Sequence, residues 1–569
     1  MRLFAGSRAA TFVAAFAVIA IGLPLHAQEK VDVATIERIK SEALERSQVM
    51  DIMSWLTDVH GPRLSWSPNM KKAANWTVET MKSWGLSNVH LETWDTPAGI
   101  GWANERFSFN ATSPNPFIVD AVPRAWSAGT NGRVSGAAVR VQVDCFAELQ
   151  QKYAGKLRNA FILPTGAPTN PVTEFNSYAS RRTDSSLATM AAATLPPAGG
   201  AGGGRAGGGR AGGGRAGDAA PPAMSPVCQQ AAAAAAAANA GGRGGRGGGG
   251  GRGGLNTGDT TTLRWMQREG VAAILMGGRG GANSVGGDIA TDNGASRARG
   301  APQVPFVHVA TESYGRIARM LERNVPVTLE LDMQNKFYPE NTSEANVVGE
   351  IPGTDPALKD EVVMIGGHFD SWHSGTGATD NAAGSGVMLE AMRILKKLNL
   401  QPRRTIRIAL WTGEEQGLLG SRAYVRQHFG YTDSTGQHFT PEQAKFAAYF
   451  NLDNGTGKIR GVYAQSNPAV APIFDAWMGP FKSMGMSTNT IGNTGGTDHL
   501  SFDAVNLPGF QFIQDPLDYS SRTHHTNQDV YERIQPDDMK FNAAVLAAFA
   551  WQAAQRDQKL PRKPLAGAQ

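Results

Sequence analysis

The stretch EVVMIGGHFD (residues 361–370) is an apolar run that ends on polar residues, and GSGVMLEAMRILKKL (384–398) follows it. The first segment is typical of a buried strand, and the second repeats its apolar residues at helical spacing. The same order continues with RTIRIALW (404–411) and GLLGSRAYVRQHF (417–429). Strands that alternate with helices predict an α/β fold, with a mostly parallel twisted sheet and helices on both faces.

Composition divides the chain into further parts around this strand–helix domain, to which we assign residues 336–560. Residues 28–120 are predicted to pack on that domain. Short strand-like pieces between Gly and Pro predict an inserted β-rich domain at 121–335. A Gly/Ala/Arg tract at about 195–258 interrupts it. We predict that the tract is disordered, because it lacks the apolar side chains that would offset its ordering entropy.

Residues 1–27 have the layout of a cleavable signal peptide. Arg2 and Arg8 precede an apolar run at 9–23, and Leu25-His26-Ala27 offers a small-residue cleavage point before Gln28. An uncleaved membrane anchor is the alternative, but the run is shorter than the roughly 20 apolar residues of a spanning helix. The sequence therefore predicts a periplasmic or secreted protein with no membrane span in its mature form.

Charge and cysteine content weigh against two classes of function. The formal net charge is +5, and residues 201–258 hold six arginines and one acid, so this tract accounts for the whole excess. A basic groove for nucleic acid is therefore not expected. Cys145 and Cys228 are too few for a thiolate zinc site. An exported protein permits them to pair, and the sequence leaves open whether they do.

Polar side chains collect where the predicted strands end. They are His368, Asp370, Asp380, Glu414, Glu415, Asp453, His525 and Asp529. Ligands of open α/β sheets bind at the carboxyl ends of the strands, so one cleft would gather these side chains. A single strand-end carboxylate is usually a helix cap or a solvated turn. So many acids in one cleft would repel one another unless divalent cations neutralised them.

Two histidines with carboxylates and no thiolate suit two zinc ions per chain that share a bridging carboxylate. We assign Asp380 as the bridge. His368 and Asp453 would complete one metal site. Glu415 and His525 would complete the other.

Three further residues have predicted roles beside the metals. Asp370 is placed to orient the imidazole of His368. Glu414 would take a proton from the attacking water and deliver it to the leaving amine. Tyr519 could donate a hydrogen bond to an oxyanion, and a purely structural aromatic role is an equal alternative.

Five segments carry a resemblance to a known family. They are GGHFDSWHSGTGATDNAAGSG (366–386), LWTGEEQGLLGS (410–421), FNLDNGTG (450–457), GGTDHLSF (495–502) and HHTNQD (524–529). This set resembles the co-catalytic di-zinc metallopeptidases that include aminopeptidase Y and plasma glutamate carboxypeptidase, over about residues 346–552. The resemblance implies the same five metal ligands and Glu414 as the general base. It favours His525 over His524, because the family places its ligand four residues before an Asp, here Asp529.

The resemblance also implies a function and an architecture. The chain would be a secreted exopeptidase that hydrolyses terminal peptide bonds or dipeptides with a zinc-activated water, and it could form a homodimer. The middle segment looks like the protease-associated domain inserted in this family, although the Gly/Ala/Arg tract departs from the family pattern. An inactive receptor homologue and a glutaminyl-cyclase-like acyltransferase with one zinc are the alternatives. The sequence leaves open whether the free amino end or the free carboxyl end of the substrate is recognised.

Overall fold

The computed structural model describes residues 29–95, 99–168, 177–195, 224–238, 255–277, 287, 289–291, 293–298 and 300–563. The predicted signal peptide and most of the Gly/Ala/Arg tract lie outside these residues. None of the helices in the described part of the chain has the length and apolar character that crossing a membrane requires.

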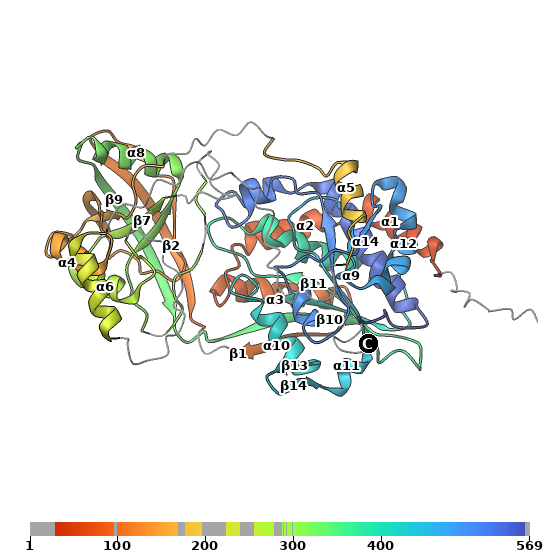
Figure 1. Cartoon of the computed structure of the whole chain (residues 1–569). Helices are drawn as coiled ribbons and strands as arrows, with labels where there is room; N and C mark the ends of the chain where they lie inside the picture. Colours follow the sequence, from red (N-terminus) through yellow and green to blue (C-terminus); the bar gives the residue numbers. More distant parts are fainter. Residues whose placement is uncertain are drawn as a thin grey trace, which may run out of the picture.

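The chain forms two lobes, each built around an eight-stranded sheet (Figure 1). In the first lobe the strand order is β1 (Ser87–Asp95), β10 (Ser343–Ile351), β12 (Thr405–Trp411), β11 (Val362–His368), β15 (Phe446–Asn451), β18 (Gly509–Gln514), β16 (Ile459–Tyr463) and β17 (Thr488–Thr490). The four central strands, β12, β11, β15 and β18, run parallel to one another. The predicted α/β class is therefore confirmed.

Helices cover both faces of the first sheet because its strands are apolar on both sides. In β11, Val363 and Ile365 face one core and Met364 faces the other, as the two-residue period of a strand requires. The larger core contains α1 (Val33–Glu45), α2 (Val49–Ser54), α3 (Pro68–Ser83), α9 (Ala383–Lys397), α12 (Ala471–Met478) and α14 (Pro536–Gln555). The opposite core contains α10 (Leu419–His428) and α13 (His499–Asp503).

The sheet of the second lobe has the order β3 (Phe117–Ile118), β2 (Gly101–Ser113), β9 (Thr328–Tyr338), β5 (Arg133–Arg140), β6 (Phe161–Leu163), β7 (Ala273–Gly277), β8 (Phe306–Val309) and β4 (Ala121–Pro123). Its helices are α4 (Phe146–Tyr153), α6 (Pro226–Ala238), α7 (Thr260–Glu269) and α8 (Thr311–Glu322). The long β2 pairs antiparallel with β9. The second sheet therefore begins at Gly101, within the segment that the sequence analysis gave to the N-terminal part.

A disulfide between Cys145 and Cys228 ties α4 to α6, which answers the question that the sequence left open. Helix α6 lies inside the tract predicted to be disordered, so that prediction is wrong for residues 226–238. Alanine is the strongest helix former, and the disulfide anchors this alanine-rich helix to the second lobe.

Two segments that belong to the second lobe in sequence dock on the first lobe. Helix α5 (Asp184–Ala191) packs beside β17, and Figure 1 shows it in the first lobe. Before it, Arg181 forms ion pairs with Asp515 at 2.9 Å and with Asp538 at 2.7 Å. Farther along the chain, the backbone N–H of Ala290 donates a hydrogen bond to Asn527 Oδ1 at 2.9 Å. Both segments therefore contact the loop 515–529, which carries the predicted ligand His525.

Candidate metal centre

The predicted site residues follow the four parallel strands of the first sheet. His368 is the last residue of β11, and Asp380 lies, with non-helical backbone angles, in the segment Ala378–Ala382 that precedes α9. The remaining ones are Glu414 and Glu415 after β12, Asp453 after β15, and Tyr519 and His525 after β18. Parallel strands end at one edge of a sheet, and the structure brings these side chains together there.

Asp380 lies at the centre of the cluster, and its two oxygens face different partners. Its Oδ1 is 3.1 Å from His368 Nε2, which is also 3.1 Å from Asp453 Oδ1. Its Oδ2 is 3.4 Å from His525 Nε2, which is 2.9 Å from Glu415 Oε2. Two groups of donor atoms thus share one carboxylate.

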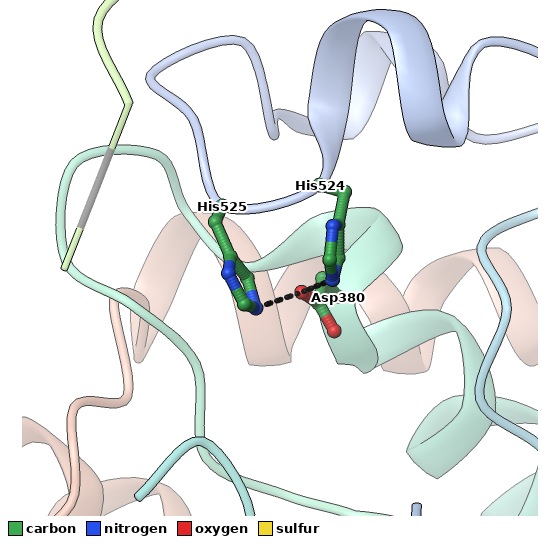
Figure 2. Close-up of side chains that lie close together, drawn as sticks. All are labelled: Asp380, His524 and His525. Atoms are coloured by element: carbon green, nitrogen blue, oxygen red, sulfur yellow. Dashed lines mark ion pairs between the residues drawn. The ribbon is translucent and has the colours of Figure 1, made fainter. Parts of the chain in front are cut away.

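His524 also approaches this carboxylate. Its Nε2 lies 3.9 Å from Asp380 Oδ2, and its ring stacks on His525 with the ring centres 3.9 Å apart. Figure 2 shows both imidazoles above Asp380. Burial, and then the charge of His525, lowers the pKa of His524 to about 4. His525 faces both Asp380 and Glu415, so the geometry is compatible with the preference for His525.

The donor set fits two divalent cations. Asp380 Oδ2 and Glu415 Oε1 are buried and accept no hydrogen bond from the residues that the structure describes. Burial and neighbouring acids raise the pKa of both Glu414 and Glu415 well above the usual range. Such a cluster of buried carboxylates is unfavourable unless cations compensate it, and imidazole and carboxylate are ligands that zinc accepts.

Asp370 acts on two parts of the site. The Nδ1 of His368 lies 3.0 Å from the backbone carbonyl oxygen of Asp370 and 3.7 Å from its carboxylate. The carboxylate accepts hydrogen bonds from the backbone N–H groups of Glu414 and Glu415 at 3.2 and 3.3 Å, and from Ser65 Oγ at 2.9 Å. Asp370 therefore holds the glutamate pair through its side chain and faces the imidazole chiefly through its backbone.

Tyr519 lies at the same edge, with its ring centre 4.8 Å from that of His524. Burial, and then the charges of Asp380 and Asp453, raises the pKa of its hydroxyl well above the usual value. The hydroxyl therefore keeps its proton at neutral pH and can act as a hydrogen-bond donor.

Three residues that support the site had no assigned role in the sequence analysis. Asp529 accepts hydrogen bonds from the backbone N–H groups of Thr379 at 2.6 Å and Asp380 at 3.2 Å. The sequence feature that could have pointed to Asp529 is its position four residues after His525. The second residue is Ser65, whose Oγ donates a hydrogen bond to the carboxylate of Asp370. The third residue is Arg63. Arg63 is fully buried and donates to four backbone carbonyls, among them those of Phe369 and Gly377. No sequence signal marks Ser65 or Arg63, because the residues of the site that they contact lie about 300 residues away.

Residues 346–550 match the family model described as Peptidase family M28. The chain is 31% identical to carboxypeptidase Q of Mus musculus over 263 residues, which cover 46% of this chain and 53% of that protein. It is 30% identical to leupeptin-inactivating enzyme 1 of Streptomyces exfoliatus over 175 residues, covering 30% of this chain and 36% of that protein. The chain thus spans about half the length of the carboxypeptidase Q that it matches.

A solved structure shares the fold of nearly the whole chain. The peptidase M28 precursor from Shewanella amazonensis SB2B superposes with a TM-score of 0.59 and 23% identity, over 94% of this chain and 99% of that one. The resemblance predicted from the motifs is therefore confirmed for the part of the chain that holds all five candidate metal ligands. Over residues 346–550 the chain is therefore similar to peptidase family M28.

Proposed function

We propose that this chain is an exported di-zinc metallopeptidase that hydrolyses terminal peptide bonds or dipeptides. The observation that carries the proposal is the Asp380 carboxylate, which faces His368 through one oxygen and His525 through the other. The match to the M28 family model and the similarity to a carboxypeptidase support the same reaction class.

In this proposal the chain would hold two zinc ions, and Asp380 would contribute to both sites. His368 and Asp453 would complete one site, and Glu415 and His525 would complete the other. When bound, the two ions would lower the pKa of water and neutralise negative charge that develops at the carbonyl oxygen.

The residues of the chain supply the remaining chemistry. Glu414 takes a proton from the attacking water and passes it to the nitrogen of the leaving amine, because a buried carboxylate beside the reacting atoms can serve as base and then as acid. Asp370 positions Glu414 by binding its backbone N–H. Tyr519 donates a hydrogen bond from its hydroxyl to the oxyanion.

We also propose that the chain acts outside the cytoplasm and that its middle segment is a protease-associated domain. The Cys145–Cys228 disulfide supports export, because such bonds persist in oxidising compartments. A homodimer is compatible with this proposal and is tested by the mass of the protein in solution.

The test is a substrate panel with zinc quantified in the same preparation. The panel contains dipeptides, aminoacyl anilides and peptides blocked at either end. We expect about two zinc ions per chain and hydrolysis that a chelator abolishes and added zinc restores. Zinc-loaded protein without hydrolysis would identify an inactive binding homologue, and cyclisation of N-terminal glutamine with one zinc would identify an acyltransferase.

A further inference from the structure

Arg297 follows a backbone segment that contacts both the second lobe and the loop that carries His525. The N–H of Ala295 donates to the carbonyl oxygen of Ala125 at 2.8 Å. Upstream, Ala290 is bonded to Asn527 of the loop that carries His525. The segment 293–298 is therefore fixed between the second lobe and the metal-centre loop.

The guanidinium of Arg297 lies against two tryptophan rings that also contact each other. Its central carbon is 5.0 Å from the ring centre of Trp66 and 5.4 Å from that of Trp126. In the described part of the chain its side chain makes no hydrogen bond or ion pair, and its Nη1 is buried. Burial lowers its pKa, and the charge of Asp370 opposes that effect. A desolvated cation without a paired anion is costly, so the side chain is set up to receive one.

Arg63 provides a contrast within the same site. It is fully buried, and its Nε, Nη1 and Nη2 all donate to backbone carbonyls at 2.8 to 3.1 Å. Its donors are therefore committed to holding the loop after β11. Those of Arg297 are not committed to any described residue.

Two observations link Arg297 to the metal centre. Its charge acts on Asp370, whose carboxylate binds the N–H groups of Glu414 and Glu415. An aromatic wall continues from its stacking partner Trp126 to Trp372 and then to His525, with ring centres 6.1 and 6.0 Å apart. The N–H donors of Arg297 are positively charged and make no hydrogen bond within the described part of the chain, so an anionic group of the substrate would be attracted to them.

We propose that Arg297 binds the free α-carboxylate of the peptide substrate and so selects dipeptides and short peptides with an unblocked carboxyl end. Guanidinium matches a carboxylate with two parallel N–H···O bonds, which lysine cannot reproduce. This inference rests on the proposed peptidase function and adds the end of the substrate that is recognised.

The test compares one dipeptide with its carboxyl-terminal amide. The zinc-loaded wild-type protein should have a higher kcat/KM for the free acid. In Arg297→Met we expect kcat/KM for the free acid to fall about 10- to 100-fold, mainly through KM, and that for the amide to stay within about threefold. Arg297→Lys should recover part of the preference. Arg316→Met is the matched control, because its guanidinium stacks on Phe117 of the second lobe at 3.9 Å, and it should change neither value.

Two results would overturn the proposal. One is equal hydrolysis of acid and amide by the wild type. The other is an equal loss on both substrates in Arg297→Met together with a lower Tm, which would make Arg297 a structural contact on the tryptophans. A second experiment does not depend on peptidase activity. It is a calorimetric titration of the protein with an N-acetyl amino acid and with the amide of that amino acid. Wild type should bind the acid more tightly than Arg297→Met does, and equal binding would reject the role of Arg297.

Discussion

Glu414 and Glu415 are adjacent carboxylates with separate tasks in the proposed reaction. The Oε2 of Glu415 is 2.9 Å from His525 Nε2, and Asp370 holds the N–H groups of both glutamates. Burial and neighbouring acids raise the pKa of both carboxyls. Ionising both carboxyls is therefore energetically unfavourable in the absence of cations, and bound cations would offset that free-energy cost.

Replacing Glu414 with alanine should abolish turnover without removing metal. Loss of a general base reduces kcat by about 10² to 10⁴-fold, whereas the five proposed ligands remain in place. The measurement is kcat with zinc content per chain. Glu79→Ala on the exposed surface of α3 is the control. A variant with near-normal kcat would show that another group moves the proton.

Replacing Asp380 with asparagine should instead remove metal. One oxygen of this carboxylate faces each donor group, so the bridge is weakened for both sites. We expect zinc content to drop from about two per chain to below one, and the Tm to fall toward that of chelator-treated wild type. Asp51→Asn, in α2, serves as control. Unchanged zinc content in Asp380→Asn would argue against the bridge.

At the scale of elements, α10 is fastened to its neighbours by a histidine. His428 Nε2 is 2.9 Å from Glu92 of β1, and its Nδ1 is 3.0 Å from Glu442 of helix Pro441–Lys445. Burial alone would lower the pKa of His428, but the hydrogen bonds and charges of the two glutamates outweigh it and raise the pKa. The charged imidazole thus joins three elements on one side of the first sheet.

The His428 contacts should stabilise the protein most at low pH. A raised pKa in the folded state means that the contribution is fully present below the unfolded value of about 6.5 and is lost as pH rises through the folded value. The Tm difference between wild type and His428→Gln should therefore be larger at pH 6 than at pH 9, with a contribution below about 1 kcal/mol. His438→Gln, in the hairpin of Gly430–Asp433 and Gly436–Phe439, controls for loss of a histidine. A difference that grows with pH would contradict this assignment.

The elements also show what the sequence could and could not predict. The strand ending at His368 and the helix α9 after it were predictable, because continuous apolar runs and helical spacing are local signals. The start of the second sheet at Gly101 was missed, because β2 pairs with β9 more than 200 residues later. The contacts of Arg63 and the stacking of Arg297 are long-range in the same way. The metal and catalytic roles assigned from the motifs stay predictions until they are measured.

At the scale of the whole molecule, the two lobes differ in what stabilises them. The first lobe has a large helix-covered core, whereas the second has two smaller cores on the faces of its sheet and a disulfide. Segments 177–195 and 289–291 join the second lobe to the metal-centre loop. A substitution in the second lobe can therefore lower the stability of that lobe without changing the metal centre.

Replacing both Cys145 and Cys228 with serine should destabilise the second lobe and leave the metal centre intact. The disulfide closes a sequence separation of 83 residues, for which loss of a cross-link costs about 4 kcal/mol. Calorimetry should show a lowered transition for one lobe, and zinc content should stay at the wild-type value. The wild type in reductant should behave like the double variant. Loss of zinc would mean that the two lobes are coupled more tightly than their contacts indicate.

The pairing of β1 with β10 has a consequence for the order of assembly. Residues of β1 lie before the second lobe in the chain, and those of β10 lie after it. Helix α1 likewise packs on α14, near the carboxyl end. Domains tend to fold as units while the chain is made. The second lobe, contiguous from β2 to β9, can therefore complete its sheet first, and the lobe that holds the metal centre becomes complete only when synthesis reaches the last helix.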